Sequence, residues 1–319
     1  MVSVVIPARD VGRFVAKAIA SALAQSIHDL EVLVVDDCSQ DDTRRQAERA
    51  VDSRVRIIDG EGRGCSAARN RATALATGQY VAFLDGDDVW RPHHLARLTA
   101  RLEACPELDL VFAASNWIDQ YDHPIPRTVV RWNGPISYEQ LFLEFAPVTT
   151  SALCLRREAL LAVGGFDETL RAGVDHDLCL RVALLRPGNC AGVPEIGIDY
   201  RRRPGQITAD RSRKALAWAS VVEKHAALAP ECVVRLRRAA TANHHRALAA
   251  SAYEDAAFAE ARAWFARAIV AAPAMMIADR RTWIAGAAVA STLLPSSAQR
   301  WIDRAGRRFL ATQRHSNFT

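Results

Sequence analysis

Short apolar runs recur along the first 84 residues, and each is long enough for one strand. They are rich in Val, Ile, Leu and aromatic residues, and they lie at residues 2–7, 31–35, 55–58 and 80–84. β-Branched and aromatic side chains are favoured in buried strands. We therefore predict a strand at each of these runs.

Segments with a helical pattern separate the runs. Val15, Ala18, Ile19 and Ala22 repeat at steps of three and four residues, which gives an apolar stripe along one side of a helix. Residues 66–76 form another helical segment, after a stretch that contains three glycines. Strands and helices that alternate in this way indicate a mostly parallel, doubly wound α/β sheet, whose helices are the crossovers between parallel strands.

Three carboxylates, those of Asp85, Asp87 and Asp88, directly follow the run at residues 80–84. Open α/β sheets bind ligands at the C-terminal ends of their strands. Asp85 and Asp87 are close enough in sequence to share a divalent cation with the phosphates of a nucleotide. The alternative is an Asp-Gly turn that leads to a helix beginning near Pro92, in which case Asp88 is a candidate for capping that helix.

The composition is that of a folded protein, with 50% hydrophobic and 24% charged residues among 319. The net charge of +5 comes almost wholly from arginine, because only three residues are lysines. Arginines gather at residues 201–203 and again at Arg307, Arg308 and Arg314. They either meet phosphates or anionic lipid, or form a solvated charged surface.

The seven cysteines have no paired metal-ligand spacing and indicate reduced, mostly buried thiols. The chain enters its first strand at Val2 without the basic and apolar segments of a signal peptide, so we expect a cytoplasmic protein. The longest apolar stretch, Trp283 to Leu294, is too short to span a bilayer. We favour a buried helix there; the alternative is peripheral contact with the cytoplasmic membrane face.

Six stretches, in this order, resemble the family 2 glycosyltransferases of the GT-A fold: VSVVIPARD, VLVVDDCSQDDT, ARN, YVAFLDGDDVWRP, GGFDE and GVDHDLCLRV. The resemblance implies an α/β protein with a Rossmann-like, mixed and mostly parallel sheet flanked by helices. It places a catalytic domain at residues 1–207 and leaves an all-helical C-terminal extension at residues 208–319.

The activity implied is inverting transfer of a sugar from a nucleotide-diphospho sugar to a glycan, lipid-linked or small hydroxyl acceptor, in polysaccharide, lipopolysaccharide or other glycan biosynthesis. The cofactor implied is Mg²⁺ or Mn²⁺. Processive members of the family carry a Gln-x-x-Arg-Trp segment, and the nearest string here is Gln299-Arg300-Trp301. The resemblance therefore implies transfer of a single sugar.

The resemblance also implies roles in the donor site. Asp87 matches the position of a DXD motif that coordinates the cation, and Asp85 matches the one that holds the ribose or a metal-bound water. Arg69, in the stretch ARN, either faces the diphosphate and the nucleotide site or forms a surface ion pair on its helix.

The ends of the first two strands are expected to hold the base. Pro7 and Ala8 would pack beside the nucleotide, and Asp37 would accept a hydrogen bond from the base, with Asp36 as the near alternative. A carboxylate accepts an N–H from a base but offers no donor, so it reads only one edge.

The stretch Val174-Asp175-His176-Asp177 matches the family's acidic pair at the start of a helix, which makes Asp175 the candidate catalytic base. Val174 stands where the family usually has Glu, which leaves the function of that Glu in doubt. Asp177 is the second candidate for the base, and it is also spaced to pair with Arg181. Further on, Arg201 and Gln206 lie in a segment that resembles the family's closing loop over the diphosphate; the alternative is a basic domain boundary.

The C-terminal third is rich in alanine and arginine, and strand signals end there. Ala261, Phe265, Ala268 and Pro273 resemble part of one tetratricopeptide-type unit. A single unit cannot form a solenoid, so the extension either packs on the catalytic domain or mediates a homodimer.

Other functions fit less well. A nucleotidyltransferase normally has a glycine-rich basic loop after the first strand, where this chain has IPARDVG. A dinucleotide-binding oxidoreductase would need G-x-G-x-x-G there. A non-catalytic helical scaffold is the third alternative, and the acidic residues at all the expected places argue against it. We expect no nucleic-acid partner.

Overall fold

The computed structural model describes the chain except residues 51, 127–131, 145–148, 207–209, 275–279 and 294–319. It consists of two compact units, Met1–Asp210 and Arg211–Thr319, which we describe separately. The domain boundary predicted between residues 207 and 208 lies outside the described residues.

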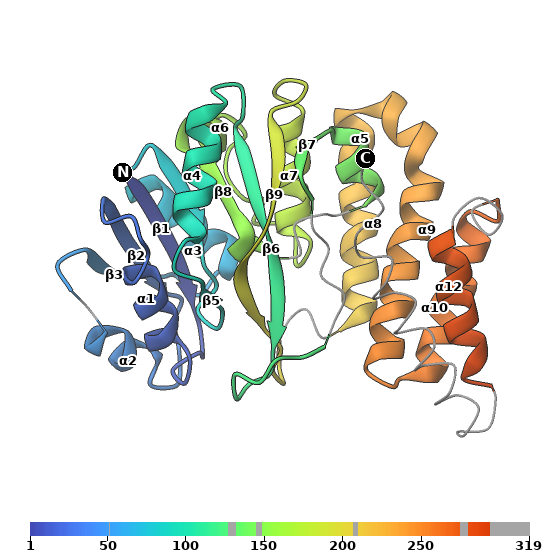
Figure 1. The fold of residues 1–319 in the computed structure, drawn as a ribbon, viewed down its shortest axis with the longest axis horizontal. Coiled ribbons are helices and arrows are strands. Elements are labelled where there is room, and N and C mark those ends of the chain that lie inside the picture. Colours follow the sequence, from blue (N-terminus) through green and yellow to red (C-terminus); the bar gives the residue numbers. More distant parts are fainter. Residues whose placement is uncertain (51, 127–131, 145–148, 207–209, 275–279, 294–319) are drawn as a thin grey trace. The chain divides into compact units, whose positions relative to one another are not determined.

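The first unit is built around one mixed sheet (Figure 1). Its strand order is β3-β2-β1-β4-β8-β6-β9-β5, and β7 pairs with β9. Its strands are β1 (Val2–Ala8), β2 (Leu30–Asp36), β3 (Val55–Asp59), β4 (Tyr80–Phe83), β5 (Val89–Trp90), β6 (Leu110–Ile118), β7 (Gly134–Ile136), β8 (Leu153–Arg156) and β9 (Cys190–Arg201). The four strands predicted from the apolar runs are parallel neighbours. Strand β8 is antiparallel to both β4 and β6 and so joins this parallel half to the parallel pair of β6 and β9.

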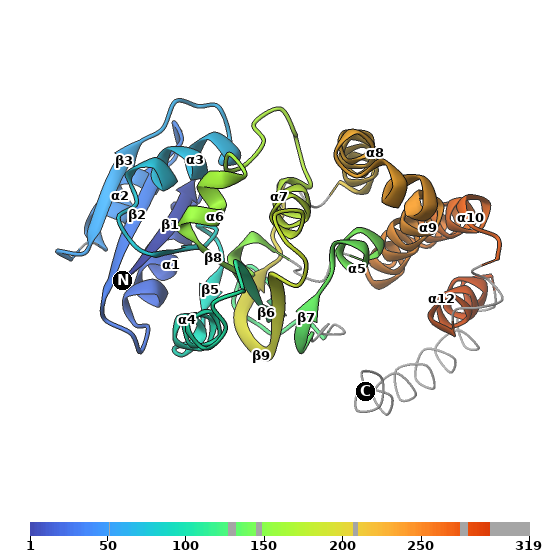
Figure 2. The same cartoon turned by 90° about the horizontal axis from the view of Figure 1, so that it is seen from above.

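Helices cover both faces of the sheet. They are α1 (Val15–Leu23), α2 (Thr43–Arg49), α3 (Cys65–Leu75), α4 (His94–Ala104), α5 (Tyr138–Leu143), α6 (Arg157–Ala162) and α7 (Val174–Ala183), with a short 3₁₀ helix at Thr150–Ala152. Figure 2 shows α3, α6 and α7 on one side of the sheet and α1 and α4 on the other. This confirms the predicted mostly parallel sheet flanked by helices.

Burial explains why these segments form. All seven residues of β1 are buried, as expected for a central strand that is covered on both faces. The predicted stripe of α1, formed by Val15, Ala18, Ile19 and Ala22, is buried as well. The apolar pattern of the sequence therefore places β1 at the centre of the sheet and turns one side of α1 towards the core.

The second unit is helical in its described residues: α8 (Arg211–Leu228), α9 (Pro230–Glu254), α10 (Phe258–Ala271) and α12 (Arg280–Ser291). Its core combines large and small side chains, so that alanines let the helices approach closely: Leu248, Ala249, Ala252, Ala261, Trp264, Phe265 and Val289. Ala261, Phe265 and Ala268, all on α10, are buried. The resemblance of this segment to a tetratricopeptide-type unit stays a prediction.

The apolar stretch from Trp283 is largely helix α12, which buries Val289 but leaves Trp283 62% exposed. No helix in the described part of the chain is long and apolar enough to cross a membrane. The basic residues Arg307, Arg308 and Arg314 lie outside the described residues.

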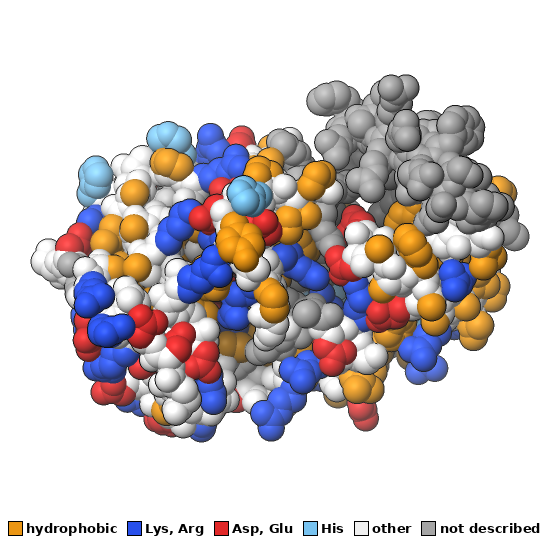
Figure 3. Space-filling model, turned by 90° about the horizontal axis from the view of Figure 1, so that it is seen from below, with side chains coloured by type: hydrophobic (Ala, Val, Ile, Leu, Met, Phe, Trp, Pro, Cys, Tyr) orange, Lys and Arg blue, Asp and Glu red, His pale blue; other side chains and the backbone are white. Residues whose placement is uncertain are grey.

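Surface charges of both signs are interspersed. In the lower left of the face drawn in Figure 3, Lys and Arg side chains lie beside Asp and Glu side chains. Some of these charges are joined in ion pairs, such as Arg44 with Glu48 and Arg71 with Glu61. Exposed pairs of this kind contribute little to stability.

His94 is a buried histidine at the start of α4. It is 1% exposed, it packs on Trp90 with ring centres 4.8 Å apart, and both ring nitrogens lack a hydrogen-bond partner among the described residues. Gly197 of β9 makes room for it, because an added Cβ would lie 2.1 Å from Nδ1 of His94. Burial, reinforced by the charge of Arg97, lowers the pKa of His94 to about 3.

We predict that His94 makes the fold sensitive to acid. The unfolded chain takes up a proton at His94 below about pH 6.5 and the folded chain only near pH 3, so stability falls as the pH drops through this window. His94→Phe should therefore reduce the stability difference between about pH 8 and pH 5 by about 2 kcal/mol, measured by urea unfolding. His93→Phe, at the exposed neighbour, is the control, and an unchanged difference in His94→Phe would contradict the prediction.

Candidate active site

An acidic turn follows β4 and carries the carboxylates of Asp85, Asp87 and Asp88. The turn closes on itself, because the amide of Asp88 donates to the carbonyl of Asp85 over 3.0 Å. Gly86 lets the turn lie against β1, since an added Cβ would be 3.2 Å from the carbonyl oxygen of Pro7. The acidic residues therefore lie at the C-terminal ends of the parallel strands, where ligand binding is expected.

Arg69 of α3 compensates the charge of Asp85. Its Nη2 lies 2.5 Å from Oδ1 of Asp85, and its guanidinium lies 5.1 Å from the ring centre of Phe166. Burial alone would lower the pKa of Arg69, but the Asp85 carboxylate raises it above the usual arginine range. The side chain of Arg69 is only 5% exposed, so the surface ion pair considered from the sequence is wrong.

Arg203 and Gln206 contact the second predicted metal ligand, Asp87. Nε of Arg203 lies 2.7 Å from Oδ2 of Asp87, and Nε2 of Gln206 lies 3.3 Å from the same oxygen. Sequence reasoning selected Gln206 but missed Arg203. No local pattern separated Arg203 from its neighbours, because residues 201–203 are three consecutive arginines.

Arg201 itself does not face a ligand in this structure, contrary to the prediction. It is 1% exposed, and its Nε donates to the carbonyl of Asp87 over 2.6 Å. Its Nη1 donates to the carbonyl of Asp119 and its Nη2 pairs with Asp122, at 2.9 and 2.7 Å. A guanidinium that satisfies these groups holds the acidic turn in place from below the surface.

Asp88 links the acidic turn to two other elements. Its Oδ2 accepts the hydroxyl of Ser151 at 2.6 Å, and its Oδ1 accepts the last backbone amide of β9 at 2.8 Å. The hydroxyl of Ser151 also accepts the amide of Asp85 at 3.0 Å. Burial, and then the charges of Asp87 and Asp85, raise the pKa of Asp88 well above its usual range. The alternative that Asp88 caps the next helix is wrong, because its carboxylate faces Ser151 and β9. Nothing in the local sequence pointed to Ser151.

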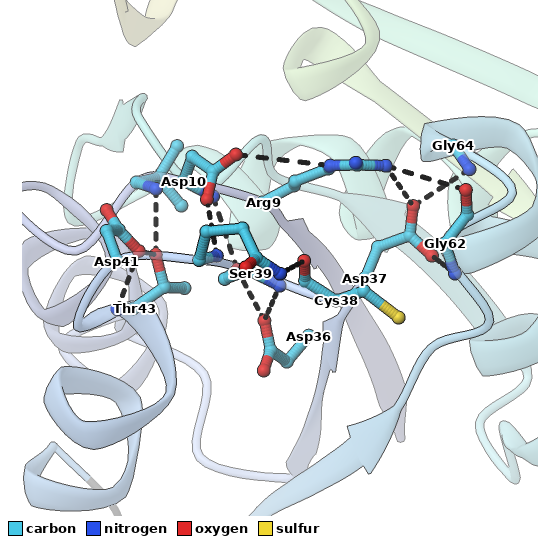
Figure 4. A network of polar contacts seen from close by, with 12 residues as sticks. Arg9, Asp10, Asp36, Asp37, Cys38, Ser39, Asp41, Thr43, Gly62 and Gly64 are labelled. Atoms are coloured by element: carbon cyan, nitrogen blue, oxygen red, sulfur yellow. Dashed lines mark hydrogen bonds and ion pairs between the residues drawn. The ribbon is translucent and has the colours of Figure 1, made fainter.

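Asp37, predicted to contact the base, organises the loop after β3 (Figure 4). Its two oxygens accept the amides of Gly62 and Gly64, each at 2.8 Å, and Nη1 of Arg9 lies 3.7 Å from Oδ2. Asp37 is 2% exposed. A base could therefore use only the lone pairs that the glycine amides leave open, and Arg9 adds a donor that the sequence reasoning did not consider.

The other residues predicted for the base lie where β1 and β2 end. The amide of Asp37 donates to the carbonyl of Ala8 over 2.8 Å, which joins the two strand ends beyond Pro7. The side chain of Ala8 is buried, so this residue would meet a nucleotide through its backbone. Asp36 accepts the hydroxyl of Ser39 at 2.5 Å, so its carboxylate stabilises the turn after β2.

Asp175, the candidate base, lies in the first turn of α7. The helix begins after Gly173, whose φ of +69° is in the left-handed region that favours glycine. Burial raises the pKa of Asp175; the amide of His176 and the charge of Arg69 oppose the shift, and the charge of Asp85 adds to it. Asp175 therefore belongs to the same electrostatic site as Arg69 and Asp85.

The residues beside Asp175 have structural contacts. Nε2 of His176 lies 2.8 Å from the carbonyl oxygen of Leu141 on α5. Asp177 is fully buried and its Oδ2 accepts Nε of Arg181 at 2.8 Å, which confirms the predicted pair. Asp177 therefore holds the helix, and Asp175 remains the better candidate for the base.

The acidic turn fits a divalent cation that also binds the nucleotide. The described residues contain no group of three or more His, Cys, Asp or Glu that could hold a metal ion by themselves. Mg²⁺ and Mn²⁺ need hard oxygen ligands, and Mg²⁺ is usually held by one or two carboxylates together with substrate phosphates. Asp85 and Asp87 offer such oxygens, and their charges add to the effect of burial in raising the pKa of Asp88.

Comparison with known proteins identifies this region. Residues 3–161 match the model of glycosyl transferase family 2. This region belongs to that family. The family 2 match covers β1 to α6, and so includes the acidic turn, Asp37 and Arg69, but ends before α7.

Individual relatives extend the comparison. The succinoglycan biosynthesis protein ExoO of Rhizobium meliloti is 33% identical over 222 residues, which are 65% of this chain and 62% of that protein. The chain spans 27%, 54% and 62% of the lengths of three curated relatives that it matches.

Two solved structures have the same fold. TarS 1-349 of S. aureus in complex with UDP-GlcNAc gives a TM-score of 0.58 at 16% identity, covering 98% of this chain and 90% of that one. The mannosyltransferase PcManGT of Pyrobaculum calidifontis, in complex with GDP-Man and Mn²⁺, gives 0.57 at 21% identity, covering 100% and 88%. The family 2 region therefore has the GT-A fold that its sequence predicts.

We predict that Ser151 stabilises the acidic turn. Ser151→Ala removes one hydroxyl that serves both the amide of Asp85 and the carboxylate of Asp88, and it leaves both groups with one partner fewer in a buried place. The free energy of unfolding should fall by about 1–3 kcal/mol, measured by urea denaturation. Ser53→Ala, at an exposed serine, is the control. Equal stability of Ser151→Ala and wild type would show that the turn does not need this hydroxyl.

Proposed function

We propose that this chain is an inverting, metal-dependent glycosyltransferase that moves a single sugar from a nucleotide-diphospho sugar to a hydroxyl acceptor. The observation that carries the proposal is the position of Arg69. It pairs with Asp85 at the acidic turn, and its guanidinium lies over the ring of Phe166, in the loop that leads to α7 and Asp175. One arginine therefore contacts both the candidate donor site and the loop before the candidate base.

The relatives support a nucleotide-sugar donor and a role in glycan biosynthesis. ExoO is named for succinoglycan biosynthesis, TarS was solved with UDP-GlcNAc, and PcManGT was solved with GDP-Man and Mn²⁺. We extend to this chain a nucleotide-sugar donor, a requirement for Mg²⁺ or Mn²⁺, and a role in making a polysaccharide, lipopolysaccharide or other glycan. A cytoplasmic location, contact with the membrane and a homodimer stay predictions.

The proposed reaction transfers one proton and replaces one bond at the anomeric carbon by another. Asp175 takes the proton of the acceptor hydroxyl, whose oxygen attacks the anomeric carbon from the side opposite the leaving group. The bond from that carbon to the diphosphate breaks, and the nucleoside diphosphate leaves with the electron pair, so the configuration inverts. Asp85 and Asp87 would hold Mg²⁺ or Mn²⁺, which supplies positive charge for the leaving diphosphate. The raised pKa of Asp175 makes it a stronger base than an exposed aspartate.

Replacement of Asp87 tests the donor end of the site. Asp87→Ala should reduce transfer or donor hydrolysis to below about 1% of wild type, because a bound metal ion contributes several kcal/mol of charge stabilisation. The assay is a panel of UDP- and GDP-sugars with Mn²⁺ or Mg²⁺, and with chelator. Asp52→Ala, whose carboxylate pairs with Arg54 at the surface, is the control. Full activity of Asp87→Ala in chelator would place the donor site elsewhere.

Asp175 and Asp177 provide a matched test of the catalytic base. Asp175→Asn keeps the shape of the side chain but cannot accept the proton, so transfer should fall by roughly a hundredfold or more while nucleotide binding is unchanged. Asp177→Asn should mainly lower stability, because it weakens the buried pair with Arg181. Turnover is measured with saturating donor and acceptor, and nucleotide affinity by calorimetry. Near-normal transfer by Asp175→Asn, with loss in folded Asp177→Asn, would move the base to Asp177.

A further inference from the structure

Arg203 occupies one of the two carboxylate oxygens that Asp87 could offer to a metal ion. The distance from Nε of Arg203 to Oδ2 of Asp87 is 2.7 Å, and Gln206 donates to the same oxygen. Gln206 also donates to the carbonyl of Arg201 over 2.6 Å and accepts the amide of Arg203 at 3.3 Å, so it ties this segment to the end of β9. In the structure, the counter-ion of Asp87 is therefore the guanidinium of Arg203.

The two arginines of the acidic turn differ in how firmly they are held. The side chain of Arg69 is 5% exposed and lies against Phe166, whereas that of Arg203 is 21% exposed. Arg203 follows the last strand instead of lying within an element, and its guanidinium lies 5.7 Å from the ring centre of Phe14. Release of Arg203 from Asp87 therefore disturbs less of the core than release of Arg69 from Asp85 would.

We propose that Arg203 is a positioning residue that serves as the counter-ion of Asp87 in the donor-free protein and leaves it for the diphosphate when a divalent cation and a nucleotide bind. This rests on the proposed function. Without nucleotide, the guanidinium of Arg203 competes with the metal ion for Asp87. When a nucleotide binds together with the metal ion, the same guanidinium binds the diphosphate, since its planar donors suit phosphate oxygens. Arg203 thereby disfavours metal binding without nucleotide and favours their joint binding.

The proposal predicts opposite effects of one substitution on two affinities. Arg203→Gln removes the competing charge, so Mn²⁺ alone should bind roughly fivefold more tightly, a difference of about 1 kcal/mol. The same variant loses a charged partner of the diphosphate, so UDP or GDP with Mn²⁺ should bind roughly tenfold more weakly. A merely structural role, or partial misfolding, would weaken both.

The experiment titrates the full chain with Mn²⁺ alone, followed by the paramagnetic signal of the free ion, and then with UDP and with GDP at saturating Mn²⁺, followed by calorimetry. The matched control is Arg202→Gln, because the guanidinium of Arg202 lies over Trp117, 5.7 Å from its ring centre. Arg202→Gln should behave as wild type, and Arg203→Lys, which keeps the charge, should bind Mn²⁺ alone as weakly as wild type.

Two failures are distinguishable. If wild type binds nucleotide with Mn²⁺ but Arg203→Gln shows the wild-type affinity for Mn²⁺ alone, the counter-ion exchange is overturned and the proposed function stands. If wild type binds neither UDP nor GDP in the presence of Mn²⁺, the proposed function fails and this inference fails with it.

Discussion

Compensation of negative charge at the acidic turn is the constraint on which the first unit depends. Asp85, Asp87 and Asp88 lie within four residues at the end of a buried strand, where like charges repel more strongly than in water. Two guanidinium groups and two hydrogen-bond donors reduce that repulsion. All of these partners come from outside the turn itself.

The partners come from both halves of the sheet. Arg69 belongs to the crossover before β4, whereas Ser151 precedes β8 and Arg203 follows β9. The antiparallel pairing of β4 with β8, and of β8 with β6, brings the second half of the sheet beside the parallel half formed by β1 to β4. The acidic site therefore depends on the pairing of the two halves of the sheet, which links the fold directly to the proposed chemistry.

A second connection joins α3 to the loop before α7. The side-chain amide of Asn70 on α3 exchanges two hydrogen bonds of 2.8 Å with the backbone of Phe166, and the ring of Phe166 supports Arg69. The loop before α7 is therefore held on the helix that carries Arg69. The charges of Arg69 and Asp85 therefore act on the candidate base at Asp175, although these residues lie far apart in the sequence.

The sequence by itself determined the elements and the acidic chemistry. The apolar runs, the stripe of α1 and the three carboxylates after β4 are local patterns, and local periodicity reports which side chains are buried in one strand or helix. The resemblance to family 2 added Asp175, which opens α7 as expected. Asp37, Asp85 and Asp87 lie at the strand ends where the sequence placed them.

Tertiary structure alone decided which groups satisfy those carboxylates. The sequence does not distinguish Arg201 from Arg203. In the structure, Arg201 binds backbone carbonyls within the core, whereas Arg203 pairs with the carboxylate of Asp87. Ser151 carries no local signal at all, because its function arises from the pairing of β8 beside β4. Partner choice depends on strand order and register, which are set by contacts between distant residues, whereas the sequence pattern reports only how each segment divides its own polar and apolar side chains.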